Sequence, residues 1–366
     1  MKGKDRLLQM VESDQILPIL SDLYGCNGEH MYQVSRYASL IRQHPAADCT
    51  ATGLFSTPGR TELGGNHTDH HHGKVIAAAI HLDIIAVATP VPEPMISLHS
   101  EGFPSVRVNL SDLTVHPEER GTTDALVRGI ARALVDRGRH IGGFIANCSS
   151  VVQPGSGLSS SAAIEVLIAT ICNELFNQGS MNPIELAACA HYAETLFFGK
   201  PSGLMDQLAC AAGGITAMDF LQPDQVKMET LSWDPSAQDH DLLIVHTGGA
   251  HEKMGHDYDS IFQEMGAVAA CFDREVLAQV PFGLFVETIG AIRDRLHDDR
   301  AVLRAYHFFT ENNRVEAMIR AMKQADMKSY LALVQASGES SATYLQNLYS
   351  TRDPRVQDIP LALALS

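Results

Sequence analysis

The chain reads Gln153-Pro154-Gly155-Ser156-Gly157-Leu158-Ser159-Ser160-Ser161-Ala162-Ala163 at a junction between two apolar segments. Phe144–Val152 before it is predicted as a strand, and Ser160–Phe176 is predicted as a strongly apolar helix. Such a junction directs free backbone N–H groups to one point, beside the positive end of the helix dipole. Glycine lets the backbone approach an anion closely, and the consecutive serines add hydroxyl donors. The stretch therefore predicts a phosphate-binding loop.

Three other interpretations of this junction compete with that one. It is also compatible with an ordinary helix start, in which Ser159 or Ser160 is the N-cap and the glycines form a tight turn. A Walker loop requires GxxxxGK[ST], a string that the chain lacks. A Rossmann fingerprint requires GxGxxG, but Ser160 stands at the third glycine position. Both of these nucleotide-binding motifs are therefore disfavoured.

Nearer the amino terminus, a polar loop reads Pro58-Gly59-Arg60-Thr61-Glu62-Leu63-Gly64-Gly65-Asn66-His67-Thr68-Asp69-His70-His71-His72-Gly73. Its histidines and Asp69 are possible metal ligands, but adjacent residues of extended chain point to opposite faces and do not easily converge on one ion. His71 and His72 fit a solvated turn instead. Asn66, His67 and Asp69 are short polar groups suited to binding hydroxyls. We therefore expect a ligand-binding loop here.

The third polar segment reads Ala193-Glu194-Thr195-Leu196-Phe197-Phe198-Gly199-Lys200-Pro201-Ser202-Gly203-Leu204-Met205-Asp206-Gln207. It places the acids Glu194 and Asp206 on either side of a Gly/Pro loop. Taken alone, either acid is also compatible with a surface charge on a helix.

The composition of the chain limits its partners and location. Its 366 residues have a formal charge of -16, which argues against a surface for nucleic acid. Charged residues interrupt the first 20 positions, so no signal-peptide core is expected. The apolar run Val75–Pro90 is too short to span a bilayer and predicts two buried strands, or one strand and a bend. We expect a cytoplasmic protein with no nucleic-acid or membrane partner, and a monomer is the default expectation.

Cysteine usage agrees with that location. The count is odd and no CxxC spacing occurs, which favours reduced thiols over a disulfide framework. The seven cysteines are Cys26, Cys49, Cys148, Cys172, Cys189, Cys210 and Cys271.

Secondary structure is mixed without steady strand–helix alternation, which predicts an α+β fold. The polar stretch Gln222–Asp241 predicts a linker, and Leu242–His246 a short buried strand. Helices are expected from Ser260 onward. Earlier helices are predicted over Asp14–Leu23, Met31–Gln43, Thr122–Arg137 and Pro183–Phe197.

Taken together, the three polar segments resemble the GHMP kinase family, in particular its galactokinase branch. The loop at 58–73 is similar to the Gly-Arg…Gly-x-His-Thr-Asp signature, the junction to the Gly-Leu-Ser-Ser-Ser-Ala phosphate loop, and the third segment to Gly-x-Met-Asp-Gln. All three occur in the family's order, and the likeness runs from about Thr52 to Tyr349. The resemblance implies a two-domain GHMP-kinase-like architecture with the active site between the domains. Residues 1–222 would form the amino-terminal domain and residues 223–366 the carboxy-terminal one.

The resemblance also implies a reaction: transfer of the γ-phosphoryl group of ATP to a sugar hydroxyl, most directly galactose to galactose 1-phosphate. Asp206 would be the catalytic base or an electrostatic anchor, and Arg60 would orient it. Mg²⁺ would be held by Ser160 and Glu194. The ATP phosphates would be cradled by Gly155, Ser156, Gly157, Leu158, Ser159, Ser160 and Ser161. The sugar would be bound by Asn66, His67, Asp69, Gly203 and Tyr258.

The sequence departs from the family pattern in several places. Asn66 stands where galactokinases usually carry Glu, and His70 where they carry Tyr. The identity of the acceptor sugar is therefore open, and arabinose or a hexosamine derivative is an alternative to galactose. In the phosphate loop, Pro154 lies one place later than is common and Ser156 replaces Gly or Ala. The family's glycine-rich third motif is not found before Ser366, which predicts an incomplete, truncated carboxy-terminal domain. A catalytically weak or inactive sugar and nucleotide sensor, and a metal-dependent hydrolase centred on residues 67–72, are the alternative functions.

Overall fold

A computed structural model of the chain describes residues 3–25, 30–45, 51–200, 202–222, 225–247 and 255–366. The chain divides into two compact units, and the division falls within two long strands. The first unit comprises Met1–Arg60, Ala79–Pro154 and Leu158–Ala212; the second comprises Thr61–Ala78, Gly155–Gly157 and Gly213–Ser366.

This division differs from the boundary at residue 222 that the sequence suggested. The strand β6 (Ile215–Asp219) pairs with the first part of β2, between Lys74 and Ala78, and both segments belong to the second unit. A single boundary along the chain cannot describe this division, because strand pairing places residues about 140 positions apart in the same unit.

The first unit has a sheet with helices on both faces. Its sheet order is β4-β3-β5-β2, with β1 also paired to β2. The strands are β1 (Gly53–Gly64), β2 (Lys74–Val91), β3 (Met95–Ser100), β4 (Val106–Asn109) and β5 (Gly143–Ser150); β1 and β2 continue into the second unit. The helices are α1 (Lys4–Val11), α2 (Leu17–Tyr24), α3 (His30–Gln43), α4 (Thr123–Asp136), α5 (Ser160–Phe176), α6 (Pro183–Tyr192) and α7 (Met205–Ala212).

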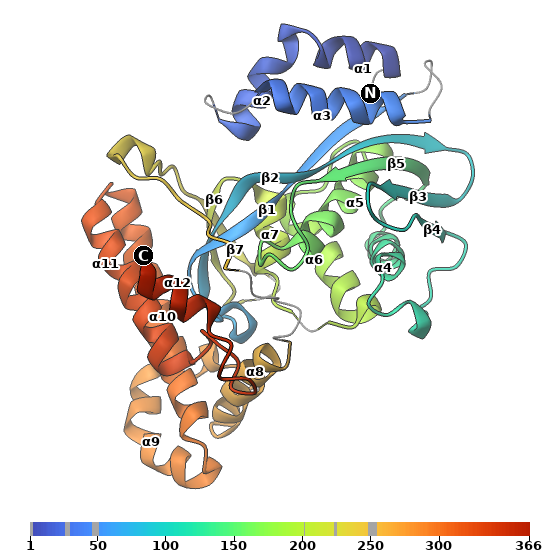
Figure 1. Ribbon diagram of the computed structural model, residues 1–366. Helices are drawn as coiled ribbons and strands as arrows, with labels where there is room; N and C mark the ends of the chain where they lie inside the picture. The colour runs from blue at the N-terminus through green and yellow to red at the C-terminus, as the bar shows by residue number, and fades with distance from the viewer. Residues whose placement is uncertain (1–2, 26–29, 46–50, 201, 223–224, 248–254) are drawn as a thin grey trace. The chain divides into compact units, whose positions relative to one another are not determined.

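Side-chain alternation along β2 explains the two layers of helices. Ile85 and Val87 pack against α1–α3, whereas Ile84, Ala86 and Ala88 point to the other face and pack with α4 and α5. Figure 1 shows α1–α3 on one side of this strand and α4–α7 on the other. Both faces of the strand are therefore buried, which accounts for its nearly continuous apolar sequence.

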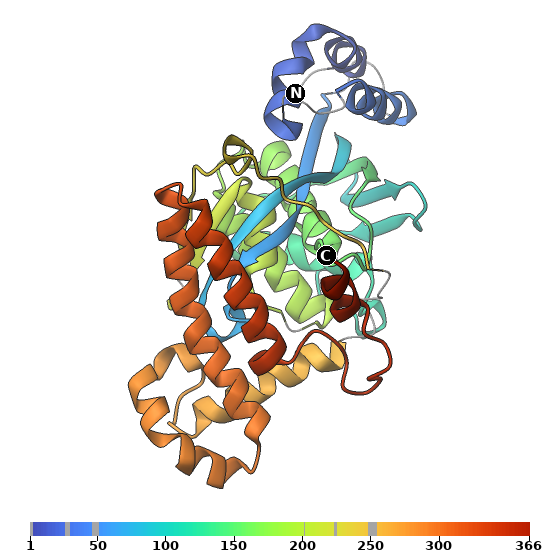
Figure 2. The same cartoon turned by 60° about the vertical axis from the view of Figure 1, so that its left-hand side comes forward.

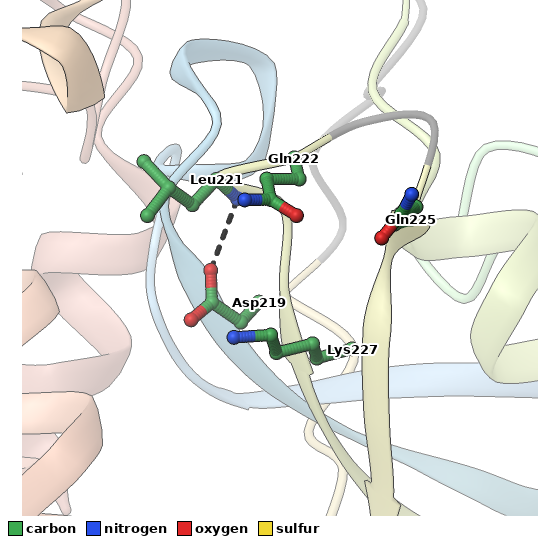
Figure 3. Close-up of a pocket in the computed structure, with 5 residues that line it drawn as sticks. All are labelled: Asp219, Leu221, Gln222, Gln225 and Lys227. Carbon is green, nitrogen blue, oxygen red and sulfur yellow. Dashed lines mark hydrogen bonds between the residues drawn. The ribbon is translucent and has the colours of Figure 1, made fainter.

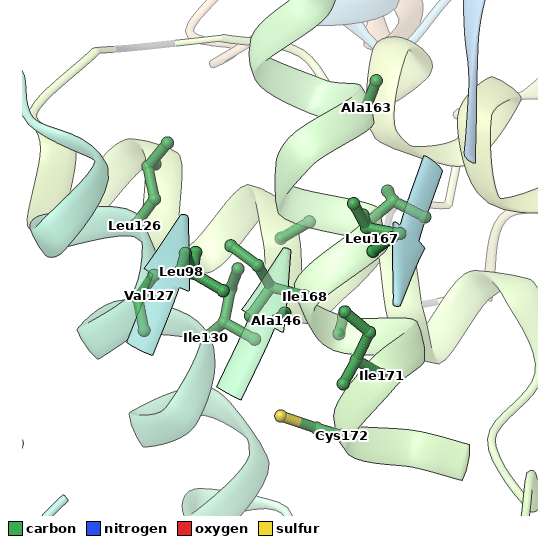
Figure 4. Close-up of a cluster of buried hydrophobic side chains, with 14 of the residues drawn as sticks. Leu98, Leu126, Val127, Ile130, Ala146, Ala163, Leu167, Ile168, Ile171 and Cys172 are labelled. Carbon is green, nitrogen blue, oxygen red and sulfur yellow. The ribbon is translucent and has the colours of Figure 1, made fainter. Parts of the chain in front are cut away.

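The main core of this unit lies between α4, α5 and the sheet (Figure 4). The helix α5 has the bounds predicted from the sequence, Ser160–Phe176, and its apolar residues are buried on several sides. The labelled core side chains are Leu98, Leu126, Val127, Ile130, Ala146, Ala163, Leu167, Ile168, Ile171 and Cys172. The helix that starts at the predicted phosphate loop is thus anchored along its length.

The expectation of two strands, or a strand and a bend, in Val75–Pro90 is wrong. A single strand runs through the region, although Asp83 lies in its middle and is buried. The reason is local neutralisation: Arg36 from α3 pairs with the Asp83 carboxylate at 2.5 Å, and Tyr24 and Ser56 each donate a hydroxyl to it at 2.6 Å. A buried charge with these partners does not interrupt a strand.

In the second unit, the short sheet formed by the start of β2, β6 and β7 (Lys227–Thr230) packs against long helices. Figure 2 shows α10 beside α11. Ile76 and Ala217 from the sheet meet Val315 and Met318 of α10 in one core cluster. The helices are α8 (Gly255–Ala270), α9 (Phe282–Leu296), α10 (Asp299–Lys323), α11 (Met327–Ser340) and α12 (Asp358–Leu365). Short 3-10 turns and π-helical turns, at Ala193–Phe198 and Ser341–Leu345, complete the described structure.

Two expectations for the middle of the chain are wrong. Gln222–Asp241 is not a plain linker, since it contains β7, and Leu231 is buried beside α10 and α11. Leu242–His246 forms no strand, and Leu243 and Val245 are 81% and 73% exposed. The apolar pattern of this short segment finds no partner strand among the described residues. The α+β fold and the helices after Ser260 are confirmed.

No helix in the described part of the chain is long and apolar enough to cross a membrane. Cys148, Cys172, Cys189 and Cys210 are buried free thiols and Cys271 is a partly buried one, while Cys26 and Cys49 lie outside the described residues.

Candidate functional site

The carboxylate of Asp206, at the start of α7, is the centre of a polar cluster in the first unit. The Arg60 guanidinium donates to its Oδ1, with Nε and Nη2 both at 2.7 Å. Ser159 donates its hydroxyl to Oδ2 at 2.6 Å. The structure thus brings together one residue from each of the three polar segments that the sequence singled out.

The charge state of Asp206 follows from these neighbours. Burial raises the pKa of its carboxyl, but the positive charge of Arg60 and the hydrogen bonds from Ser159 and Arg60 outweigh that effect, so the pKa lies below its ordinary value. The side chain still keeps 28% of its exposed area. Asp206 is therefore an anion at neutral pH with one side open to a ligand.

Ser159 has an unusual backbone conformation for a residue before a helix. Its φ of 59° and ψ of 52° are left-handed, and its side chain makes no capping bond because the hydroxyl is given to Asp206. Gly155 and Gly157 are also left-handed, with φ of 71° and 76°. By helix geometry the first N–H groups of α5 have no acceptor within the helix. The interpretation as an ordinary capped helix start is therefore wrong.

The glycine of the Gly-Arg pair is explained by close packing against this loop. The N–H of Arg60 donates to the carbonyl of Leu158 at 3.1 Å. A Cβ on Gly59 would lie 2.7 Å from that same carbonyl oxygen and 3.2 Å from a methyl of Val152. Only glycine lets β1 approach the predicted phosphate loop this closely.

We expect Gly59→Ala to move the loop and lower kcat/KM about 100-fold, because a shift of about 1 Å in positioning groups has an effect of that size. Steady-state kinetics and thermal unfolding measure the two consequences. Gly290→Ala is the matched control: its Cβ would meet nothing within 4 Å, so activity should not change. Wild-type kinetics in Gly59→Ala would contradict the packing argument.

Glu194, predicted as a metal ligand, lies 2% exposed in a ring of donors. Its Oε1 accepts from Lys200 Nζ at 2.8 Å, and its Oε2 accepts from Ser202 Oγ at 2.5 Å and from Gln207 Nε2 at 2.8 Å. No hydrogen bond joins Glu194 to Ser160 in the part of the chain described. A cation already pairs with this carboxylate, namely the ammonium group of Lys200.

Behind Glu194 lies Glu165, which the sequence did not single out. It is fully buried on α5, and its Oε2 accepts from the same Gln207 amide at 3.1 Å. Burial, with a smaller contribution from the charge of Glu194, raises the pKa of Glu165 well above its usual range. Glu165 thus supports Gln207 from the helix, and through it Glu194. In the sequence, a single Glu within the apolar first part of this helix was the feature that could have indicated Glu165.

In the second unit, three of the predicted sugar-binding residues, Asn66, His67 and Asp69, lie in the loop between β1 and β2. The rings of His67 and Tyr258, from α8, are stacked with centroids 5.2 Å apart. The amide of Asn66 donates to Ser341 Oγ at 2.8 Å. Asp69 begins a 3-10 turn, and Gly203 lies in the first unit just before α7. The loop is therefore an ordered structure tied to α8 and to the π-helical turn at Ser341–Leu345.

The interpretation of His71 as part of a solvated turn is wrong. Its ring is 1% exposed; Nε2 donates to the carbonyl of Phe262 at 3.0 Å, and Nδ1 accepts from the N–H of Leu277 at 3.3 Å. The ring also packs against Phe262 and Phe308. Since both nitrogens serve the backbone, His71 is a structural residue. Among the described residues, no three His, Cys, Asp or Glu side chains gather as a metal site.

His71 also makes the second unit sensitive to acid. Burial lowers the pKa of His71 from 6.5 to about 4, so folding favours the neutral ring. The contribution of the neutral ring to the free energy of unfolding is complete above pH 6.5 and is lost as the pH falls towards 4. The loss amounts to about 3 kcal/mol. Urea unfolding followed by the fluorescence of Trp233, which packs in the second unit, should show this decline. His71→Asn should flatten it; an unchanged slope in that variant would assign the decline to other groups.

Sequence reasoning missed the residues that hold this loop from α10. The N–H of Gly65 donates to Glu311 Oε1 at 3.1 Å, and the N–H of Lys74 donates to Asn312 Oδ1 at 2.7 Å. His307 contacts the carbonyl of Asn66 at 2.8 Å. These partners lie about 240 positions from the loop, so no local pattern indicates them.

A small hollow in the second unit lies at the end of β6 (Figure 3). In it, Asp219 Oδ1 accepts from the N–H of Leu221 at 3.0 Å. None of the predicted site residues lines it, and we assign it no role. Its lining residues are Asp219, Leu221, Gln222, Gln225 and Lys227.

Comparison with known proteins identifies related families and folds. Residues 125–214 match the family described as GHMP kinases N terminal domain, and residues 45–90 match the galactokinase galactose-binding signature. A galactokinase from Lacticaseibacillus casei strain BL23 is 30% identical over 80% of this chain and 75% of its own length. A galactokinase from Streptomyces coelicolor is 29% identical over 79% of this chain and 73% of its own length.

Solved structures show the same fold. Lactococcus lactis galactokinase, crystallised with galactose, superposes with a TM-score of 0.66 at 21% identity, over 90% of this chain and 79% of that one. Methanococcus jannaschii mevalonate kinase gives a TM-score of 0.52 at 16% identity, over 83% and 82%.

Proposed function

Since the chain belongs to the galactokinase branch of the GHMP kinase family, and is thus an ATP-dependent sugar kinase, we propose that its acceptor is galactose. The product would be galactose 1-phosphate, formed when the γ-phosphoryl group of ATP moves to the anomeric hydroxyl. The observation that carries the proposal is the cluster of Asp206, Arg60 and Ser159, one residue from each of the three motifs.

In this reaction, Asp206 would act on the attacking hydroxyl. The sugar oxygen forms a bond to the γ-phosphorus, the bond to ADP breaks, and the hydroxyl proton passes to the Asp206 carboxylate. Phosphoryl transfer depends mainly on positioning and on electrostatic stabilisation. A carboxylate with a lowered pKa therefore suits this role, because it is ionised and ready to accept a proton at neutral pH.

Arg60 would have two roles. It holds Asp206 through two nitrogens, which orients the carboxylate, and its remaining charge can offset the negative charge that grows on the transferred group. Its backbone N–H, bonded to Leu158, also fixes β1 to the phosphate loop. The same residue thus supports the acceptor side and the phosphate side.

The phosphates of ATP would be bound by the loop Gly155–Ser161. Left-handed residues at 155, 157 and 159 shape this backbone, and the free N–H groups at the start of α5 lie next to the positive end of the helix dipole. Because Ser159 gives its hydroxyl to Asp206, we propose that it contributes its backbone to the phosphates, while Ser160 and Ser161 contribute hydroxyl groups.

The residues present fit a magnesium ion, and we propose Glu194 and Ser160 as its ligands. Carboxylate and hydroxyl oxygens are the donors that Mg²⁺ prefers, and Glu194 already pairs with a cation, the ammonium group of Lys200. When bound, the ion would neutralise charge on the ATP phosphates. Gln207, supported by Glu165, keeps the Glu194 carboxylate in place.

For the acceptor sugar, we propose Asn66, His67, Asp69, Gly203 and Tyr258 as binding residues. The stacked rings of His67 and Tyr258 form an aromatic surface of the kind that sugars contact, and Asn66 and Asp69 supply polar groups for hydroxyls. We also propose a cytoplasmic monomer; the free cysteines and the need for ATP support that location.

An ADP-release assay with galactose, arabinose, galactosamine and N-acetylgalactosamine tests the proposal. We expect the highest kcat/KM with galactose, and ³¹P NMR should show phosphate on the anomeric carbon. A preference for another sugar would refute the assignment of galactose. Calorimetric binding of sugar and ATP with no ADP release would show a binding protein without kinase activity.

A further inference from the structure

The sugar-signature loop of the second unit is held by side chains that come from far along the chain. Glu311 of α10 is completely buried and accepts from the N–H of Gly65 at 3.1 Å. Its carboxylate is held in turn by Ser337 and Arg314, each at 2.6 Å. This arrangement fixes the backbone of the loop one residue before Asn66.

Asn66 itself is held at both its backbone and its side chain. Nε2 of His307 donates to the Asn66 carbonyl at 2.8 Å, and the Asn66 amide donates to Ser341 Oγ at 2.8 Å. Both partners are buried: His307 is 0% and Ser341 is 5% exposed. One hydrogen bond thus holds the backbone of Asn66, and the other holds its side chain.

The hydrogen bonds of His307 fix which of its ring nitrogens carries the proton. A carbonyl only accepts, so Nε2 must carry the proton, and the other ring nitrogen then accepts from Ser340 Oγ at 2.8 Å. Ser340 ends α11, and Ser341 begins a π-helical turn, Ser341–Leu345. Turns of this kind are rare and are frequently found at functional sites. Here the turn places the two neighbouring hydroxyls on different partners, His307 and Asn66.

We propose that Ser341, together with His307, is a positioning residue that sets acceptor-sugar affinity by fixing the Asn66 side chain. With its amide nitrogen committed to Ser341, Asn66 offers its Oδ1 to the sugar and accepts a hydrogen bond from a sugar hydroxyl. The affinity for the acceptor thus depends on a residue 275 positions away from Asn66. The inference rests on the proposed sugar kinase function, and Ser341 itself does not touch the substrate.

Steady-state kinetics on three variants test this role. Ser341→Ala should raise the KM for galactose about fivefold to tenfold, the effect of one lost hydrogen bond, with kcat and the KM for ATP within twofold of wild type. Ser341→Thr keeps the hydroxyl and should restore the KM. Ser329→Ala, an exchange of an exposed serine at the start of α11, is the matched control.

A double-mutant cycle separates positioning from general stability. If Ser341 acts through Asn66, then Ser341→Ala should add nothing to the galactose KM of Asn66→Ala. Additive effects, or an unchanged KM in Ser341→Ala, would overturn the proposal.

A measurement without substrate tests the tether of the loop independently of the proposed kinase function. Hydrogen exchange of the peptide covering residues 64–73 should be several-fold faster in Ser341→Ala than in wild type or Ser329→Ala. Unchanged exchange would overturn the positioning role even in an active kinase. Conversely, faster exchange in a chain that phosphorylates no sugar would support the loop tether while refuting the proposed function.

Discussion

Replacing Asp206 by asparagine should lower kcat for sugar phosphorylation by about 10³-fold or more, with little change in stability. Asparagine keeps the shape of the side chain, and its one oxygen can still accept from Arg60 or Ser159. What it loses is the negative charge and the ability to take the proton of the attacking hydroxyl. The ADP-release assay measures the loss, and thermal unfolding checks the fold.

The same variant distinguishes catalysis from binding. Calorimetry should give a galactose affinity within about threefold of wild type, because we assign most sugar contacts to the loop at 66–69 and to Tyr258. Asp219→Asn is the matched control, an equivalent exchange on β6 at the hollow to which we assign no role. Turnover near that of wild type in Asp206→Asn would refute the proposed role of Asp206.

Replacing Asp83 by asparagine should destabilise the first unit by about 3–5 kcal/mol, since it leaves the buried Arg36 guanidinium without its counter-charge. The two side chains are 3% and 6% exposed, and Arg36 also donates to the carbonyls of Asp83 and Ser149. This network joins α3 to the middle of β2. Urea unfolding followed by far-ultraviolet circular dichroism measures the change.

Two companion variants make the result specific. Arg36→Met combined with Asp83→Asn removes both charges and should recover part of the lost stability, because no unpaired charge remains buried. Glu12→Gln breaks the exposed pair with Arg42 on the same helical layer and should cost less than about 1 kcal/mol. A cost for Asp83→Asn no larger than that of Glu12→Gln would contradict the role of the buried pair.

Several features could be predicted because they depend on neighbouring residues. The bounds of α5 follow from an apolar run that begins at three serines, and the glycines before it predict the phosphate loop that we propose. The family membership follows from three motifs in order. The predicted strand and helix patterns failed where burial depends on distant partners: Asp83 lies within a strand because Arg36 neutralises it, and Leu243 is exposed because no described strand pairs with it.

The site shows the same limit. The sequence by itself determined which side chains we propose for the chemistry, namely Asp206, Arg60 and the serines of the proposed phosphate loop, because motifs preserve residue type and spacing. Only the tertiary structure decided how they are held: Ser159 bonds to Asp206 instead of capping α5, and Ser341 holds Asn66 across 275 positions. Hydrogen bonds act over about 3 Å in space, whatever the separation along the chain, so such pairings appear only once the chain is folded.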